Sequence, residues 1–321
     1  ERFHAYAYVT FVSCVCLEYT INLGAALRRR PRLVQLIKTC CGLEPLLNAP
    51  RDTFKTLVTY SLGCLGFQIS LVAFCLSLAV ISDFGLIHLR HVEGVPTSFR
   101  GLSVVLGIDY IVVILPTCLM PRIYLTYFFG AFRLYLRCIR SNIEACMQST
   151  LVPPDRKKEM LEEYRALLNT LKTCVNETGV TLGTGLMYTY SYAACLFCAS
   201  IFYIFVPNTS NDIRLFFLGS GFMHFVSLLV PTVVVHKFTE DVSDLRNTVQ
   251  SYYFAALPKD VFDQVSMMVF ALEKENFRFC VNGFFNVHLP AYASIIGAAL
   301  TYTIVLVQTH NLHLEDPTMF L

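Results

Sequence analysis

Three polar side chains recur every seven residues in the last apolar stretch of the chain, 289–309, which reads LPAYASIIGAALTYTIVLVQT. Because seven residues are close to two helical turns, Ser294, Thr301 and Gln308 share one face of a helix, which also carries Gly297 and Ala298. A single helix with a narrow polar stripe cannot enclose water, but several copies around a symmetry axis could form an aqueous path. Gln308 would then form a ring of amides near one mouth. The alternative is ordinary helix packing, because small and hydroxylated residues are favoured where membrane helices touch.

A second candidate for chemistry is Asp109, a single carboxylate in an otherwise apolar part of the stretch 101–132. A charge at that depth costs several kcal/mol unless it is paired or hydrated, so it is a candidate for binding a ligand, together with the adjacent Tyr110. The alternative is a buried Asp that is hydrogen-bonded to a neighbouring helix or kept neutral. Four further side chains could complete such a site: Ser77, Phe202, Tyr203 and His224. For His224 and for the two aromatic residues, a place in the packed core is the commoner explanation.

Other kinds of site find little support in the sequence. His310 and His313 lack a third metal ligand, and no nucleophile, pair of carboxylates or Gly-rich phosphate loop stands out. We therefore expect no enzyme, no metal and no cofactor, and the absence of a basic tail argues against nucleic acid as a partner. Glu18 and Arg122, placed toward the inner ends of their apolar stretches, are expected to snorkel or to pair there.

The elements that must position these residues are membrane-spanning helices. Charged residues make up only 15% of the chain, and none occurs in four long stretches, 56–82, 178–211, 215–236 and 279–314. About 20 apolar residues suffice to cross the hydrocarbon core. Two more stretches, 3–27 and 101–132, are long enough but carry Glu18, Asp109 and Arg122. The sequence therefore predicts an all-α polytopic membrane protein with six crossings in this region, and a seventh if a helix precedes Glu1.

The distribution of basic residues predicts the orientation of these helices. Three alternating connections, 28–55, 133–181 and 237–289, hold 20 of the 25 Lys and Arg residues, and such loops stay in the cytosol. The C-terminus is then outside, the reverse of a G-protein-coupled receptor. The glycosylation acceptor Asn208-Thr209-Ser210 falls on the predicted outer side, as glycosylation requires.

The inner connections are expected to be helical rather than flexible. Apolar residues recur with the helical period after Leu161 and again after Pro258, where Asp260 is placed to cap the helix. The stretch 101–132 would extend roughly 48 Å as a helix, against a core of about 30 Å. We interpret these segments as membrane helices that project inward and pack into one bundle. The alternative is separate helices lying on the lipid headgroups.

The last helix resembles that of insect gustatory receptors, which carry Thr-Tyr, five apolar residues and Gln-Phe. The matching residues are Thr301, Tyr302, the run 303–307 and Gln308, while Thr309 stands where the family has Phe. The preceding Gly283-Phe284-Phe285 and the Ser-Ile-Ile-Gly of 294–297 are also similar. The resemblance is strongest over the C-terminal 50 residues and is architectural before them.

The resemblance implies a seven-helix subunit, N-terminus inside, of a ligand-gated cation channel in the plasma membrane of sensory neurons. Four identical or related subunits would surround a pore lined by the last helix, with Gln308 as the outer gate and Ile304 one turn below it. Thr309 closes a pore less well than Phe. A tastant would bind in the outer half of region 1–257, and 258–321 would supply the pore and an anchor helix around Val261 to Phe285. The alternatives are an odorant-type receptor channel or a secondary transporter.

Overall fold

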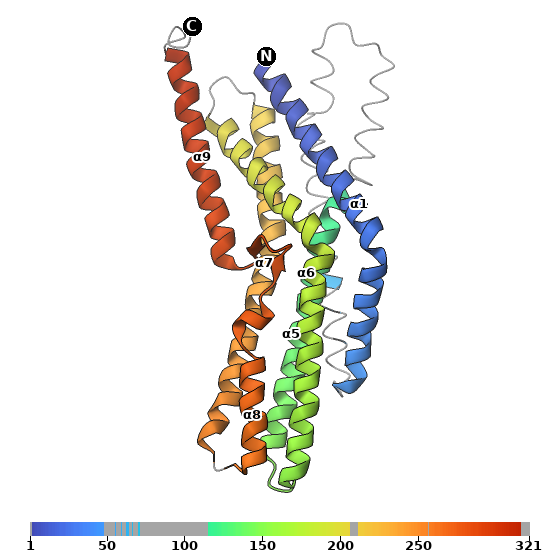
Figure 1. Cartoon of the computed structure of the whole chain (residues 1–321). Helices are drawn as coiled ribbons and strands as arrows, with labels where there is room; N and C mark the ends of the chain where they lie inside the picture. Colours follow the sequence, from blue (N-terminus) through green and yellow to red (C-terminus); the bar gives the residue numbers. More distant parts are fainter. Residues whose placement is uncertain are drawn as a thin grey trace.

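A computed structural model describes residues 2–47, 115–205, 211–255 and 257–315, together with six isolated residues between 55 and 70. Its architecture is a bundle of long helices (Figure 1). The described helices are α1 (Arg2–Leu46), α5 (Leu115–Gln148), α6 (Pro154–Phe205), α7 (Asn211–Ser251), α8 (Lys259–Ala271) and α9 (Leu289–Glu315). A short 3-10 turn, η2 (Tyr252–Phe254), follows α7, and another, η3 (Lys274–Phe277), follows α8. The beginning of α1 and the end of α9 lie at the same end of the bundle (Figure 1).

The inward extensions that the sequence predicts are present as continuations of the long helices. Helix α6 runs unbroken for 52 residues, from Pro154 through the charge-free stretch to Phe205. The predicted apolar positions in its first half face the interior, with Leu161, Leu168 and Leu171 fully buried. Helices α5, α7 and α8 pack with α6 at this end of the bundle (Figure 1). The interpretation as one packed bundle, rather than separate surface helices, is therefore confirmed.

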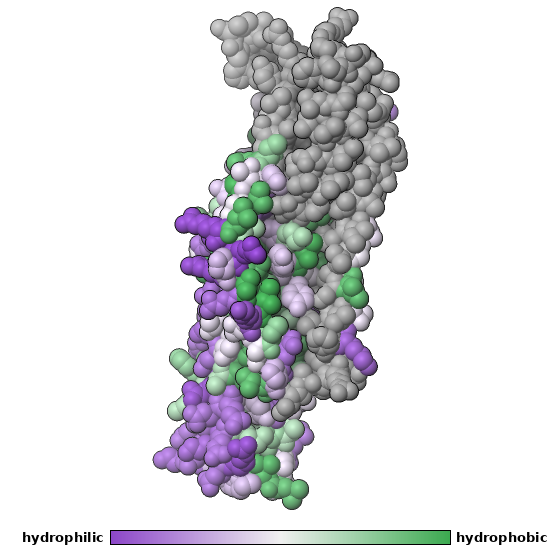
Figure 2. Space-filling model, turned by 90° about the vertical axis from the view of Figure 1, so that its right-hand side faces the viewer, coloured by the Kyte–Doolittle hydropathy of each residue, from purple (hydrophilic) through white to green (hydrophobic). Residues whose placement is uncertain are grey.

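Three helices in the part of the chain that the structure describes are long and apolar enough to cross a membrane. They are α6, the segment Phe217–Phe254 that includes most of α7, and Leu289–Thr309 in α9. The last of these coincides with the segment that the sequence predicts. On the face that Figure 2 shows, hydrophilic residues lie at the lower end of the bundle and part-way along the described surface. The chain has an all-α, polytopic membrane fold.

Two predictions about α8 are wrong. The helix does not continue to Phe285 but ends at Ala271, after which the chain forms η3 and a two-stranded hairpin. Asp260 does not cap α8, because Pro258 occupies the N-cap position and no side chain bonds there. Asp260 lies in the first turn instead and pairs with Lys158 of α6 at 3.6 Å. The buried face of α8 agrees with the prediction: Val261, Val265, Met268 and Leu272.

The hairpin between α8 and α9 explains why the charge-free stretch 279–314 is not one helix. Strands β1 (Cys280–Val281) and β2 (Phe285–Asn286) pair antiparallel, with Val281 opposite Phe285. At the turn, Asn282 and Gly283 have φ values of 49° and 78°. An Asn-Gly pair is the most favourable sequence for a tight turn with positive φ, so it breaks the helical path before Leu289.

Two glycines of α6 allow this hairpin to lie directly against the helix. A Cβ atom at Gly179 would lie 2.8 Å from the carbonyl oxygen of Cys280, and one at Gly183 would lie 2.6 Å from the Asn282 side chain. Asn282 also donates a hydrogen bond of 3.1 Å to Thr184. The hairpin immediately precedes α9, so the small residues of α6 set where α9 begins.

Replacement of Gly179 by Ala tests the fit of this hairpin. In an open helix the change gains up to about 1 kcal/mol from helix propensity. At Gly179 the methyl group would meet backbone, so we expect a net loss of about 1–3 kcal/mol. The measurement is thermal unfolding of the purified protein in detergent.

The matched control is Gly42→Ala in α1, where a Cβ meets nothing within 4 Å. It should hold or raise the unfolding temperature. Equal effects of the two substitutions would mean that the hairpin does not lie against α6 at Gly179.

Candidate functional site

Helix α9 contacts the rest of the chain along one side. Tyr292, Ala299 and Thr303 are buried there against α6 and α7. The Tyr292 hydroxyl donates a hydrogen bond of 2.8 Å to the carbonyl oxygen of Phe225 in α7. Thr303 donates to the carbonyl oxygen of Ala299 at 2.8 Å and approaches that of Cys198 in α6 at 3.5 Å. These contacts fix which face of α9 points away from its own subunit.

The polar stripe lies on that opposite face. Thr301 is two residues from both Ala299 and Thr303, which at 100° per residue places it about 200° around the helix from them. Ser294 and Gln308, seven residues to either side, are exposed as Thr301 is. Ile304 and Thr309, the other residues predicted to line a pore, are exposed as well. The chain therefore presents all five predicted pore residues on its outer surface.

The hydroxyl groups of this stripe are oriented by their own helix. Ser294 donates a hydrogen bond to the carbonyl oxygen of Pro290 at 2.9 Å, and Thr301 donates to that of Gly297 at 3.0 Å. Thr309 donates to the carbonyl oxygen of Val305 at 2.9 Å. Because each proton is already used, the oxygen lone pairs are what these residues offer outward. Such a surface suits a cation or water better than an anion.

Little free space remains behind α9. A cavity of about 20 Å³ lies between α6, α7 and α9, large enough for about one water molecule. It is lined by aromatic and aliphatic side chains that include Tyr190, Phe197, Phe225 and Tyr292. Within the described part of the chain, α9 is thus well packed on its inner side.

The residues predicted to bind a ligand are separated where the structure describes them. Tyr203 stacks on Phe217 of α7, with ring centroids 4.3 Å apart, and Phe202 packs edge-on against Tyr203. His224 is buried beside Tyr192, with ring centroids 5.2 Å apart. Tyr192 and Tyr203 are 11 residues apart on α6, about 16 Å along the helix, so His224 does not join the other two. Asp109, Tyr110, Ser77 and Asn208 lie outside the described residues.

The structure pairs Glu18 of α1 with Arg122 of α5, but not at the inner boundary where the sequence placed them. The carboxylate and guanidinium are 3.5 Å apart, and the two side chains are 2% and 0% exposed. Thr189 of α6 donates a hydrogen bond of 2.9 Å to Glu18. Arg122 donates one of 2.5 Å to Ser227 of α7. Pairing is confirmed, whereas snorkelling is wrong because neither group reaches the surface.

Distances along the helices place this ion pair deep among the spans. Thr189 is nine residues beyond Val180, near the level at which the hairpin lies on α6, or about 13 Å along the helix. Arg122 is seven residues, about 10 Å, from Phe129, whose ring contacts Phe279 beside the hairpin. In a hydrocarbon core about 30 Å thick that begins at the hairpin, distances of this size place the ion pair near the middle of the core. One acid and one base in different apolar stretches are a signal that could have been recognised in the sequence.

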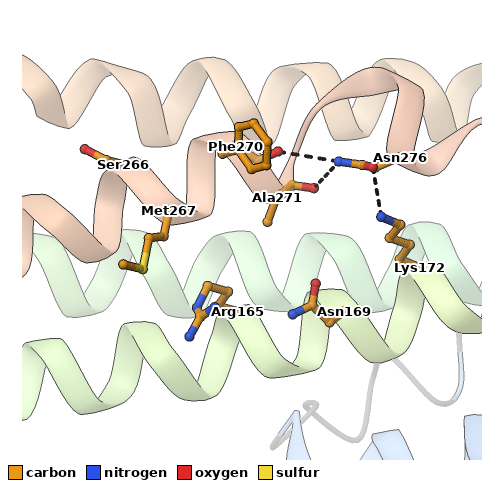
Figure 3. Close-up of a pocket in the computed structure, with 8 residues that line it drawn as sticks. All are labelled: Arg165, Asn169, Lys172, Ser266, Met267, Phe270, Ala271 and Asn276. Carbon is orange, nitrogen blue, oxygen red and sulfur yellow. Dashed lines mark hydrogen bonds between the residues drawn. The ribbon is translucent and has the colours of Figure 1, made fainter.

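A groove of about 530 Å³ lies between α6 and α8, and Figure 3 shows the residues that line it. On its floor Lys172 donates a hydrogen bond of 2.8 Å to Asn276, and the Asn276 amide in turn reaches the carbonyl oxygen of Ala271 at 3.4 Å. The exposed Met267 and Phe270 lie beside it. No residue predicted to bind a ligand lines this groove, and nothing in the sequence analysis predicts the groove. Its lining residues are Arg165, Asn169, Lys172, Ser266, Met267, Phe270, Ala271 and Asn276.

Comparisons with known proteins agree with this architecture. The family described as 7tm Chemosensory receptor matches residues 1–312. Among solved structures, the insect olfactory receptor OR5 from Machilis hrabei is similar, with a TM-score of 0.65 and 17% sequence identity. The match covers 93% of this chain and 80% of that receptor. No curated protein sequence matches the chain.

Removal of one partner of the buried ion pair should destabilise the protein strongly. We expect Arg122→Met to cost about 3–5 kcal/mol, because it leaves the Glu18 carboxylate buried without its counter-charge. The double variant Glu18→Leu with Arg122→Met should recover most of that loss, since it removes both desolvated charges. The measurement is thermal unfolding of the purified variants in the same detergent. A double variant less stable than the single one would contradict a pairwise interaction.

Proposed function

Because the chain belongs to the 7tm Chemosensory receptor family, we propose that it is a gustatory receptor that acts as a ligand-gated, non-selective cation channel. Four copies surround one pore, each contributing α9. A small tastant binds in the outer half of each subunit and opens the pore without a G protein. The protein resides in the plasma membrane of sensory neurons, and Asn208 is glycosylated on the outer side.

The observation that carries the proposal is the two-sided character of α9. One side bonds to α6 and α7 through Tyr292 and Thr303. The other side bears Ser294, Thr301 and Gln308 and is left uncovered by the subunit. If these polar groups faced lipid, they would find no hydrogen-bond partners in the bilayer. If several copies of α9 surround an axis, the same groups line a water-filled pore.

The chemistry of that uncovered side favours cations. Ser294 and Thr301 direct oxygen lone pairs outward, because their protons are bonded within α9. No Lys or Arg occurs between Arg278 and the chain end, so the lining is free of fixed positive charge. Gln308 forms the outer gate and Ile304 narrows the pore one turn below. Since Thr309 replaces a larger apolar residue, closure depends more on Ile304 than on a hydrophobic plug beside Gln308.

Assembly is supported by the outward side of α8. Phe262, Met267 and Phe270 are 40%, 51% and 71% exposed on this helix, and Phe284 of the hairpin is 75% exposed. This set, which we call the α8 apolar surface, belongs to a predicted cytosolic part of the chain where lipid does not cover it. Contact with neighbouring subunits would bury it and anchor the four copies.

An odorant-type receptor channel is the second candidate. It is favoured by the structural similarity to an olfactory receptor over 93% of the chain. The gustatory assignment is favoured by Thr301, Tyr302 and Gln308, which resemble the gustatory motif of the last helix. The chemistry of the pore is the same in both cases, and only the ligand differs.

The direct test of channel function is current from the chain expressed alone in whole cells, during exposure to a panel of sugars, bitter compounds and volatile odorants. We expect a ligand-evoked cation current that persists when G-protein signalling is blocked. A response that requires a G protein would contradict the channel assignment.

Replacement of Gln308 by Glu tests the gate. The substitution adds a ring of negative charges at the outer mouth, so we expect stronger inward rectification and higher relative permeability to divalent cations. The measurement is the current–voltage relation in solutions of different cation composition. Gln250→Glu, the same change at an exposed position of α7, should alter neither property. Unaltered permeation in the Gln308 variant would mean that this residue does not line the pore.

Replacement of Phe270 by Glu tests the α8 apolar surface. A charge in a buried subunit contact would be desolvated, so we expect the tetramer to dissociate into smaller species. Light scattering of the purified protein in detergent measures the assembly size. Leu151→Glu, at a loop position that is 93% exposed, should leave the tetramer intact. Tetramers that survive the Phe270 substitution would place the subunit contacts elsewhere.

A further inference from the structure

Four arginines lie within five residues of helix α1, at Arg28, Arg29, Arg30 and Arg32. Arg28, Arg30 and Arg32 are exposed, whereas Arg29 is half-buried. No acidic residue occurs on α1 between Glu18 and Glu44. Glu18 is buried beside Arg122, and Glu44 accepts a hydrogen bond from Tyr135, so neither neutralises the arginines. We call the exposed three, Arg28, Arg30 and Arg32, the arginine collar.

Contacts of the neighbouring Arg29 fix the level of the collar relative to the other helices. Its guanidinium donates hydrogen bonds to the carbonyl oxygens of Val180 and Thr181 in α6. These residues stand at the start of the charge-free stretch of α6 and beside Gly179, where the hairpin lies. The collar therefore surrounds α1 where the apolar stretches of α1 and α6 both begin, at the level of lipid headgroups.

The side of α1 that faces away from the bundle changes from apolar to basic at the height of the collar. Leu23 and Leu27 are 38% and 66% exposed, and Arg30 follows them on the same side of the helix, one turn further along. Figure 2, which views the side where α1 lies, shows hydrophilic residues part-way along the described surface as well as at its lower end. Apolar side chains followed by a cation match the order of acyl chain and phosphate in a phospholipid.

Electrostatics at the collar favours an anion. Partial burial lowers the pKa of Arg29, and repulsion from Arg32 and then Arg28 lowers it further. Acidic Glu177 of α6 lies nearest along that helix, one turn before Val180, and is exposed. Three mutually repelling cations in little more than one helical turn exceed what a single negative charge can balance, so a headgroup with several phosphates fits better than a monoanionic one.

We propose that Arg28, Arg30 and Arg32 bind a polyphosphorylated inositol lipid of the inner leaflet. The acyl chains lie against Leu23 and Leu27, and the phosphates contact Arg30 directly below them. Arg28 and Arg32 lie about 200° around the helix from Arg30, so they reach the headgroup from the other flank of α1. Each arginine of a juxtamembrane basic cluster strengthens binding of anionic lipid about fivefold, which makes three arginines a substantial site.

This site is connected to the pore helix, an extension that rests on the proposed channel function. Arg29 bonds to Val180 and Thr181, and the hairpin lies on Gly179 and Gly183 of the same segment of α6. The hairpin leads directly into α9. Lipid bound at the collar thus steadies α1 against α6 and, through the hairpin, holds the inner end of α9.

The test uses the full chain purified and inserted into nanodiscs. Discs of phosphatidylcholine alone are compared with discs that also contain phosphatidylinositol 4,5-bisphosphate or, separately, phosphatidylserine, and retained lipid is measured by native mass spectrometry. Wild type should retain the bisphosphate lipid and release phosphatidylserine. The variant Arg28→Gln/Arg30→Gln/Arg32→Gln should bind it more weakly by on the order of a hundredfold.

The matched control is Arg156→Gln/Lys157→Gln/Lys158→Gln, which removes equal charge at the start of α6. These residues are about 35 Å along the helix from Val180, far beyond the screening length. The control should bind lipid as wild type does. If the triple collar variant does not fold, Arg30→Gln alone, on the outer side of α1, should still weaken binding about fivefold.

Three results would overturn the proposal: equal retention by the collar variants and wild type, equal loss in the control, or equal retention of phosphatidylserine. The binding measurement needs no current, so it stands apart from the channel assignment. Ligand-evoked current that is unchanged by the bisphosphate lipid, together with intact binding, would overturn only the connection to α9.

Discussion

Helix α9 is attached to its own subunit along one side, and the arrangement of the rest of the chain follows from this constraint. Tyr292 and Thr303 bond to α7 and α6, and only 17% of the apolar span 289–309 is buried within the subunit. The exposed surface of such an apolar helix must be covered by lipid, by other copies of the chain, or by both. Because the side opposite the attachment carries Ser294, Thr301 and Gln308, the polar groups are the ones that need a wet or protein partner. Apolar residues on the flanks, such as Tyr302 and Leu306, are suited to neighbouring helices or lipid.

The position of α9 in turn depends on one cross-section of the bundle, at residues 179–183 of α6. There the hairpin and α1 contact α6, and the apolar stretches of the helices begin. Gly179 and Gly183 admit the hairpin, Arg29 bonds to the carbonyl oxygens of Val180 and Thr181, and α9 begins at Leu289. Above this level the helices are joined by polar contacts inside an apolar environment, among them the ion pair of Glu18 with Arg122. Below it they form a bundle whose outer surface carries hydrophilic residues together with the α8 apolar surface. Movement of α1 or α6 at this level would therefore be transmitted to the start of α9 through short, well-packed connections.

The long helices could be predicted from the sequence, whereas the turn and cap residues and the depth of the ion pair could not. The helical period after Leu161, and the span from Leu289 to Thr309, were readable because both extend over many turns of one periodicity. The hairpin was missed because a charge-free stretch shows only that a segment is apolar, whereas Asn282 and Gly283 decide its backbone path. Asp260 was assigned as a cap from residue type, but Pro258 ends the preceding loop two residues earlier. Glu18 and Arg122 are expected from the sequence at the inner boundary, and their depth is evident only from the four helices that place Thr189 and Ser227 around them. The predicted ligand residues on α6 and α7 illustrate a related limit, because sequence cannot show that Tyr203 and His224 lie two or more turns apart.

Channel function depends most on where the polar side of α9 points in the intact assembly. Electron cryo-microscopy of the full chain in nanodiscs shows this directly. We expect particles with fourfold symmetry in which four α9 helices surround the axis, with Ser294, Thr301 and Gln308 directed toward it. Monomeric particles, or α9 helices at the periphery with these residues against lipid, would contradict it.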